Sequence, residues 1–513
     1  MLNAALLLPA LLSPNAGPGD YLVVRVALDA ARASDRGYLA AAAKAAERHH
    51  ATTIDWDGDD FVALDHELQQ RQPENVLFVL RPESLDVMRH RRILLLSSRL
   101  DDDWFVDFAF GYLTAEDGAG CEKLWQHIEQ RRERGAHGGV WLDLAVASMD
   151  RSAVYSGAVP ELAKAAGFHG DQYYFGTGDA ERETMVALAL AATAMSDVLH
   201  FSGNGDTEGI WLFPGERNRD RDKHWPYAAA RVGEDQDGAM PRLLAPRFRE
   251  LTWQAPIVWS GTCHSGAVDR VFVEGDIVST FGRTDCTTVH RLAPTHSLAL
   301  SWLAAGAAGL IVPIAANHGL SAAMEIDFTL QHGSSLGEAI KSTWDDVLLQ
   351  AEGKLVLDFP VEGEPHRRGE EKVMQGGGAN RVLIGDPALR PFAATPSAAE
   401  QVVAAADGGG ATVTVTRAAG FSPRGWDMYG VDRTRDWRVL VRVDLDALGL
   451  AAVPGFAVEV KAATPDGQDL PFTRQRCAIE HHAGRTWLHL QANAARAAVE
   501  RKAARVVFTL RPR

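Results

Sequence analysis

Short apolar runs alternate with amphipathic segments along the first 150 residues of the chain. Tyr21–Ala27, Asn75–Leu80 and Arg92–Ser97 are rich in aliphatic side chains and predict strands, whereas Arg36–His49 and Cys121–Arg134 have the spacing of helices. Continuous apolar strands separated by helices are typical of a mostly parallel sheet that is buried on both faces. The pattern therefore predicts an N-terminal α/β subdomain over residues 21–150.

The same alternation continues to Pro391 and predicts a second α/β subdomain over residues 151–392. We expect the two subdomains to contain two linked sheet regions that divide near residue 150. The segments that carry this part of the pattern are Val140–Val146, Val198–Ser202, Ile257–Gly261, Gly309–Ile314 and Arg381–Ile384 as strands, and Arg182–Met195, Ser297–Ala305 and Gly337–Leu349 as helices.

After Pro391 both the composition and the apolar period change. Ala393–Gly410 is rich in Ala, Gly and Ser and predicts a linker. Beyond it apolar residues recur at every second position, as in Val439–Leu445 and Phe456–Val460. Alternation of this length without a long helix is typical of an antiparallel sandwich. We therefore expect a small Ig-like β-sandwich over residues 411–513.

The first 20 residues form a leader with two interpretations. Ala4–Leu12 is apolar and small residues follow it, as in a signal peptide, but the first basic residue is Arg25. Secretory signals carry positive charge in front of their apolar core. We therefore expect an unstructured leader on a cytoplasmic protein, with export as the alternative.

Composition and charge restrict the class of protein further. The chain has 513 residues, is 46% hydrophobic and carries 52 Lys and Arg against 67 Asp and Glu, a net charge of -15. This balance argues against nucleic-acid binding through bulk charge. No run approaches the roughly 20 apolar residues that a membrane-spanning helix needs. The scattered Cys121, Cys263, Cys286 and Cys477 exclude a disulfide scaffold and are compatible with a reducing compartment.

Two predicted strands end in turns with candidate chemistry. Asp197–Ser202 leads into Gly203-Asn204-Gly205, and Pro256–Ser260 leads into Gly261-Thr262-Cys263. Catalytic groups in parallel sheets gather beyond the carboxyl ends of the strands, and neighbouring strands lie about 4.8 Å apart. A cysteine among small residues at such an end suits an attacking thiolate with backbone N–H groups around an oxyanion.

These turns resemble the gingipain-type cysteine peptidases of the caspase-like clan. In that family one strand ends in an aromatic-Ser/Thr-Gly-His-Gly turn and a later strand ends in a Cys turn; Phe201–Gly205 and Gly261–Cys263 match them in order. Arg381–Arg390 is similar to the family's closing Gly-Asp-Pro signature, and Asp101–Tyr112 to its Asp-rich loop and strand. The resemblance covers roughly residues 20–395. It implies a caspase/gingipain-like fold followed by a sandwich, and an endopeptidase that acts on protein or peptide with Cys263 as nucleophile.

One residue departs from the family pattern, because Asn204 stands where the motif has His. Asn cannot accept a proton near neutral pH and cannot be the general base. Three interpretations stay open: a pseudo-peptidase that only binds peptide or protein, a different base (His200, His264 or His318), or a thiolate formed without any His through local N–H groups and positive charge.

The remaining candidates follow from these turns. The expected oxyanion and turn residues are Gly203, Gly205, Gly261 and Thr262, and the expected substrate contacts are Asp103, Trp211 and Trp259. Cys286 and His290 have a spacing that metal ligands sometimes use, but they do not form a standard arrangement with Cys263 and His264. We therefore expect no metal and no cofactor.

Overall fold

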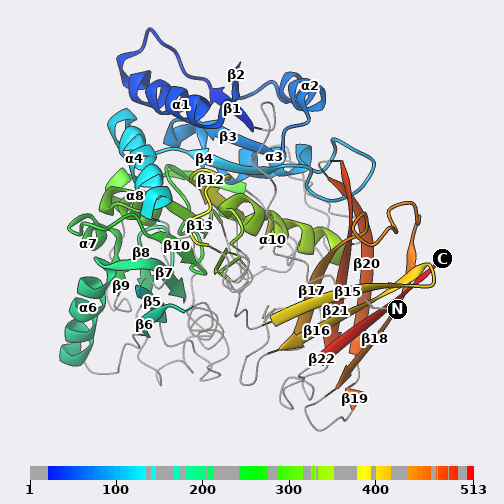
Figure 1. Ribbon diagram of the computed structural model, residues 1–513. Coiled ribbons are helices and arrows are strands. Elements are labelled where there is room, and N and C mark those ends of the chain that lie inside the picture. The colour runs from blue at the N-terminus through cyan, green and yellow to red at the C-terminus, as the bar shows by residue number, and fades with distance from the viewer. Residues whose placement is uncertain are drawn as a thin grey trace.

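A ten-stranded β-sheet forms the centre of the chain up to Ile384 (Figure 1), in the order β2-β1-β3-β4-β14-β13-β10-β7-β5-β6. The structure is a computed structural model. The residues that it describes are 21–134, 140–145, 167–172, 179–202, 205–211, 242–274, 286–315, 325–326, 329–330, 333–351, 378–393, 400–417, 437–463, 469–470, 472–482, 484–494 and 505–513. The leader, residues 1–20, lies outside them.

The sheet consists of two parallel blocks that run in opposite directions. The first block contains β1 (Tyr21–Val26), β2 (Thr52–Trp56), β3 (Asn75–Val79), β4 (Ala109–Leu113) and β14 (Arg381–Ile384). The second contains β5 (Val140–Ala145), β6 (His169–Gln172), β7 (Ser196–Ser202), β10 (Ile257–Ser260) and β13 (Gly309–Pro313). β13 and β14 pair antiparallel. The expected pair of linked sheets is therefore wrong, because one continuous sheet contains both blocks. The blocks also do not divide at residue 150, since β5 belongs to the second block and β14 to the first.

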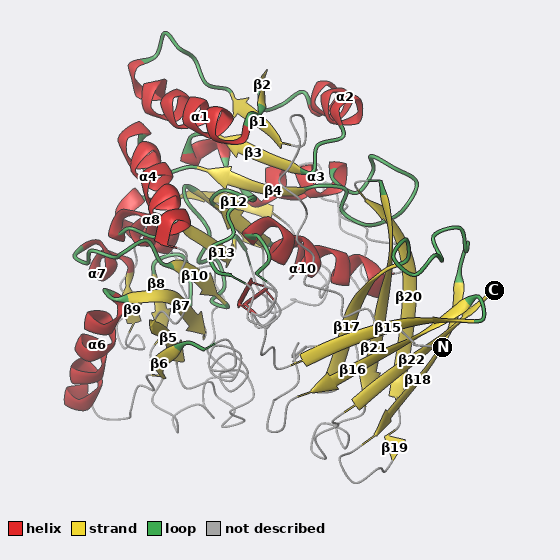
Figure 2. Ribbon diagram, viewed as in Figure 1, coloured by secondary structure: helices red, strands yellow, loops and turns green. Residues whose placement is uncertain are grey.

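Helices cover both faces of this sheet (Figure 2). α1, α4 and α8 follow one face, whereas α2, α3 and α10 follow the other, where Trp344 of α10 stacks on Phe110 of β4. The helices are α1 (Arg36–His49), α2 (Phe61–Arg71), α3 (Val87–Leu96), α4 (Gly118–Arg134), α6 (Asp179–Thr193), α7 (Ala245–Arg249), α8 (Leu298–Ala305) and α10 (Leu336–Ala351), with single 3-10 turns at Ala33–Asp35, Pro82–Ser84 and Pro294–His296. None of the helices described is long and apolar enough to cross a bilayer.

The expected strand at Arg92–Ser97 is wrong, because this segment belongs to α3. The Asp86 side chain accepts a hydrogen bond from the Arg89 backbone N–H and starts the helix before the apolar run. The buried positions Val87, His90, Ile93 and Leu94 lie three and four residues apart, which is the spacing of one helix face. A short apolar run by itself does not distinguish a buried strand from a buried helix.

Two antiparallel sheets at the C-terminus pack face to face. β15 (Glu400–Asp407), β16 (Gly410–Arg417), β18 (Phe456–Ala463), β19 (Asp469–Leu470) and β22 (Arg505–Pro512) form one sheet, and β17 (Trp437–Asp444), β20 (Phe472–His482) and β21 (Arg485–Ala494) form the other. Apolar side chains from both sheets share one core. The alternating pattern thus correctly predicted a sandwich.

The expected linker at Ala393–Gly410 is wrong over Glu400–Asp407, and its residues 394–399 lie outside the described part of the chain. Strand β15 occupies Glu400–Asp407 and pairs with β16 along all eight residues. Ala404 is buried in the sandwich core although its side chain is small. An edge strand needs a backbone partner on one side only and one covered face, so Ala-rich sequence is sufficient there. Two antiparallel strand pairs complete the described elements: β8 (Gly209–Trp211) with β9 (Arg242–Leu244), and β11 (Arg270–Glu274) with β12 (Cys286–Arg291).

Candidate active site at the carboxyl ends of β7 and β10

The turns that follow β7 and β10 lie in direct contact. The two strands are parallel neighbours, and Ser260 pairs with Phe201 at their carboxyl ends. A Cβ atom placed on Gly205 would lie 2.3 Å from Cγ2 of Thr262 and 2.5 Å from the Gly209 carbonyl oxygen. Only a residue without a side chain permits this approach. The structure thus brings the Gly205 turn against the Cys263 turn.

Two serine hydroxyls fix the chain around Cys263. The backbone N–H of Thr262 donates to Oγ of Ser260, 3.0 Å away, and the Ser265 hydroxyl donates to the Thr262 carbonyl oxygen at 2.8 Å. Ser260, Thr262 and Ser265 are fully buried, whereas Cys263 is partly exposed. Cys263 is therefore a partly exposed residue on a turn whose hydroxyl-bearing residues are buried.

The turn is also attached to β13. The backbone N–H of His264 donates to the Ala315 carbonyl at 2.9 Å, and that of Gly266 donates to the Pro313 carbonyl at 2.8 Å. His264 adopts a positive φ of 58°, which is uncommon for a residue with a side chain. Cys263 is thereby held between strands on either side of β10.

The expected oxyanion donors Gly261 and Thr262 already have other partners. The Gly261 N–H donates to the Phe201 carbonyl at 2.9 Å, and the Thr262 N–H donates to the Ser260 hydroxyl. An oxyanion hole needs N–H groups directed at the reacting oxygen. In this conformation neither of these groups meets that condition, and the assignment of both as oxyanion donors is corrected.

His264 follows Cys263 in the chain, and its imidazole is a weak base. Burial lowers the pKa of His264 to about 4, and the carboxylate of Asp206 opposes the shift. Sequence reasoning missed Asp206, which lies one residue after Gly205. Its Oδ1 accepts hydrogen bonds from the backbone N–H groups of Glu208 and Gly209, at 2.8 and 2.9 Å. Asp followed by Thr-Glu-Gly is a turn signal that was available in the sequence.

The other predicted residues are buried in the sheet, are described by their backbone pairing alone, or lie outside the described part of the chain. Trp259 is fully buried in the sheet, so its assignment as a substrate contact is wrong; consecutive strand residues face opposite sides, and this one faces the core. His200, its partner on β7, is also buried. The backbone of Trp211 pairs with Arg242 in β8 and β9. The residues outside the described part are Gly203, Asn204 and His318.

Asp103 belongs to the contact with the C-terminal sandwich. Its Oδ2 accepts a hydrogen bond from the backbone N–H of His481 in β20, 2.6 Å away. Nearby, Phe105 packs with Leu349 and Ala478 and stacks on the His489 ring at 4.1 Å between centroids. The structure therefore gives Asp103 an interdomain partner in place of the expected substrate.

The Gly-Asp-Pro signature also has a structural role. Asp386 is fully buried and accepts hydrogen bonds from the Tyr21 hydroxyl at 2.7 Å, from Nε2 of His49 at 2.9 Å and from Nη2 of Arg132 at 2.6 Å. Burial alone would raise its pKa, but His49, Arg132 and Tyr21 outweigh that effect and hold the pKa of Asp386 well below its usual range. Asp386, which follows β14, thus connects β1, α1 and α4 through hydrogen bonds.

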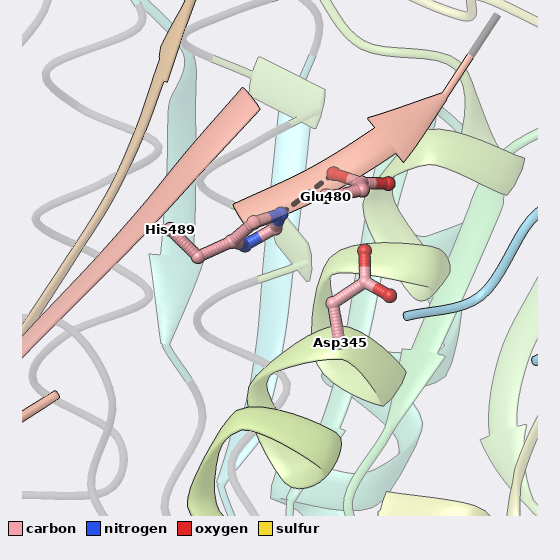
Figure 3. A group of neighbouring side chains, drawn as sticks. All are labelled: Asp345, Glu480 and His489. Carbon is pink, nitrogen blue, oxygen red and sulfur yellow. Dashed lines mark hydrogen bonds and ion pairs between the residues drawn. The ribbon is translucent and has the colours of Figure 1, made fainter. Parts of the chain in front are cut away.

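One buried group of side chains has the composition of a metal site (Figure 3). Asp345 of α10 and His489 of β21 both point to Glu480 of β20. One ligand atom from each of the three residues lies within 4.8 Å of the others. Lys341 places its ammonium group between the carboxylates, 2.7 Å from Asp345 and 2.5 Å from Glu480. Arg442 adds a second cation, 2.7 Å from Glu480. The protein's own cations balance both carboxylates, and the group is an ionic contact between α10 and the sandwich.

Comparisons with known proteins give a distant likeness to proteases. No protein-family model matches the chain, and no curated protein matches it. A complex of the RgpB pro- and mature domains from Porphyromonas gingivalis is 11% identical over 91% of this chain and 93% of that chain, with a TM-score of 0.44. A structure described only as a protease is 9% identical over 94% and 92%, with a TM-score of 0.43. Function is therefore argued from the residues of the site.

Proposed function

We propose that this chain is a cysteine endopeptidase of degenerate gingipain type, with Cys263 as its nucleophile. The observation that carries the proposal is the partly exposed Cys263 on a turn fixed to β7 and β13, at the carboxyl edge of a parallel block. Reacting groups collect at this edge because loops from neighbouring strands converge there. The contact between Gly205 and Thr262 adds a second turn beside the thiol.

Formation of the acyl-enzyme requires that a proton leaves the Cys263 sulfur and that a proton reaches the nitrogen of the leaving amine. The Cys263 sulfur loses its proton and attacks the peptide carbonyl carbon, which forms a C–S bond and an oxyanion. Collapse breaks the C–N bond, and the leaving amine takes up a proton. Water then cleaves the thioester and restores the thiol. A histidine normally carries the proton from sulfur to nitrogen.

The supply of this base limits the proposed activity. Asn204 occupies the turn position where the family resemblance implies His, and an amide cannot carry the proton. A pKa of about 4 makes His264 a weak acceptor for a thiol proton. A missing general base typically lowers a rate by about 10² to 10⁴. We therefore expect slow peptide hydrolysis. His318 is the remaining imidazole candidate, since His200 is buried in β7.

A second candidate function is peptide or protein binding without hydrolysis. Two observations favour it: the N–H groups of Gly261 and Thr262 are engaged within the protein, and His264 is a weak base. Such a protein would still bind peptide at the carboxyl ends of β7 and β10 but would not hydrolyse it.

One experiment separates the two functions. The full chain is treated with a panel of peptidyl acyloxymethyl ketones, which form a thioether with an activated cysteine, and peptide cleavage is measured in parallel. Cys263→Ala removes the nucleophile, Cys477→Ala is the matched control at another partly buried cysteine, and Asn204→His restores an imidazole. We expect weak labelling that Cys263→Ala abolishes and Cys477→Ala leaves unchanged.

Asn204→His should raise labelling and cleavage by at least about tenfold if a base is what the site lacks. Labelling that persists in Cys263→Ala would overturn the assignment of the nucleophile. Peptide binding by wild type, without labelling or cleavage in wild type or Asn204→His, would establish the binding function instead.

A further inference from the structure

Arg381 reaches across the junction between the two parallel blocks. It is the first residue of β14, pairs with Pro313 of β13, and is fully buried. Its Nη1 donates to the Ser260 carbonyl oxygen at 3.0 Å, and its Nη2 lies 3.4 Å from the Ile311 carbonyl oxygen. One guanidinium group therefore contacts β13 and the carboxyl end of β10.

Glu325 holds this guanidinium in one orientation. Its two carboxylate oxygens accept from Nε and Nη2 of Arg381, each at 2.5 Å, and Oε1 also accepts from the Thr343 hydroxyl of α10 at 2.9 Å. Both charged side chains are fully buried. A bidentate carboxylate pair fixes the plane of an arginine as well as its charge.

The carbonyl that Arg381 contacts belongs to the residue on which the Cys263 turn depends. Ser260 is the last residue of β10, and its hydroxyl accepts the Thr262 N–H. Ser265 places its own hydroxyl 3.1 Å from the same oxygen. A shift of Ser260 would therefore move the hydrogen bonds on both sides of the thiol.

Stability alone is a weak reason for a buried pair of this kind. Buried ion pairs are often replaceable by apolar residues at little or no cost in stability, since desolvation offsets the attraction. An apolar residue cannot supply the guanidinium N–H groups that bind the Glu325 carboxylate and a backbone carbonyl at the same time. The Arg381 guanidinium is pre-organised for that geometry, which a lysine ammonium does not reproduce.

We propose that Arg381, oriented by Glu325, is a positioning residue that sets the Cys263 turn through the Ser260 carbonyl. The inference rests on the proposed role of Cys263 and extends it to a residue on the other block of the sheet. Its effect on the thiol passes through the backbone of the turn, by way of the Ser260 carbonyl.

The test compares Arg381→Lys with Arg131→Lys, a matched control. Arg131 is another fully buried arginine, paired with Asp197 near the start of β7, at the opposite end of that strand from the Gly205 turn. Three quantities are measured on the full chain: the melting temperature, amide hydrogen exchange of residues 257–267, and the rates at which Cys263 reacts with iodoacetamide and with an acyloxymethyl ketone.

We expect Arg381→Lys to accelerate exchange in residues 257–267 by about tenfold beyond any change in Arg131→Lys. Reaction with the ketone, which requires an oriented thiol, should fall by about tenfold or more, whereas iodoacetamide should react within about twofold of wild type. A role in stability alone would lower the melting temperature of both variants and leave the ratio of the two rates unchanged.

The two proposals fail in different ways. Wild type that does not react with the ketone, combined with faster exchange in Arg381→Lys, rejects the peptidase and keeps the positioning of the turn. Wild type that reacts, with exchange and rate ratio unaltered in Arg381→Lys, rejects the positioning residue and keeps the peptidase.

Discussion

Gly205 lies so close to Thr262 that a methyl group on the glycine would stand 2.3 Å from the threonine Cγ2. These residues follow β7 and β10, and about 55 residues of chain separate them. Their contact determines how near the first turn approaches the thiol of Cys263. It also makes the spacing between the turns sensitive to a single carbon atom.

Gly205→Ala should therefore disturb the site more than its small size suggests. Overpacking typically costs about 1–3 kcal/mol, because the neighbouring backbone must shift. We expect a loss of that order in the free energy of unfolding, measured by urea denaturation, together with an altered rate of Cys263 alkylation. Gly455→Ala is the control, since a methyl group there would meet nothing within 4 Å. Equal effects of the two substitutions would show that the turns separate without cost.

The cysteines should differ in their reactivity toward iodoacetamide. Cys121 is fully buried, and burial raises the pKa of its thiol well above the usual value. Burial also raises the pKa of Cys477, although Arg513 opposes the shift. Alkylation requires an accessible thiolate. Mass spectrometry of the folded protein should show Cys263 modified about tenfold faster than Cys121, Cys286 or Cys477. Slowest modification at Cys263 would contradict the site assignment.

Lys341 should matter more than any surface lysine. Its substitution by Met leaves Asp345 and Glu480 buried without the ammonium between them. Removing one partner of a buried pair costs about 3–5 kcal/mol. Urea denaturation should show this loss, and the double variant Lys341→Met/Asp345→Asn should recover part of it. Lys44→Met, at an exposed ion pair with Glu122, should cost less than about 1 kcal/mol. Equal losses at both positions would mean that the interdomain cluster adds nothing.

The same interdomain contact should respond to pH. Burial raises the pKa of Asp103 to about 6 and that of Asp107 to about 8. The folded state therefore keeps protons that the unfolded state has already released above about pH 4. Stability contributed by these protons is complete below pH 4 and is lost as the pH rises toward 8.

Asp107→Asn cannot lose this proton, and its amide oxygen can still accept from the Leu100 N–H, as the carboxylate does at 2.7 Å. We expect its melting temperature to exceed that of wild type by about 2 °C or more at pH 9 and to match it closely at pH 4. Asp102→Asn, at an exposed neighbour, should follow wild type at both values. If the melting temperatures of wild type and Asp107→Asn changed with pH in parallel, the raised pKa of Asp107 would be refuted.

The fold class could be predicted from the sequence because a strand that is buried on both faces of a sheet has a continuous apolar run. Val198–Ser202 and Ile257–Ser260 are mostly apolar, as is typical of strands inside a helix-covered sheet. Alternation at Val439–Leu445 likewise predicted one covered face in the sandwich. Local pattern misled where it was ambiguous: Arg92–Ser97 is helical because of the Asp86 cap, and Glu400–Asp407 is a strand because β16 lies beside it.

The sequence by itself determined the order of the strands along the chain, the alternation of layers and the position of Cys263 just beyond β10. Those properties depend on residues within a few positions of one another. Only the tertiary structure decided that the two blocks share one sheet, that Gly261 and Thr262 use their N–H groups internally, and that Arg381 reaches Ser260. Residues 260 and 381 are far apart in the chain. They come into contact only when β10, β13 and β14 assemble in one sheet, so no local sequence pattern can predict the contact.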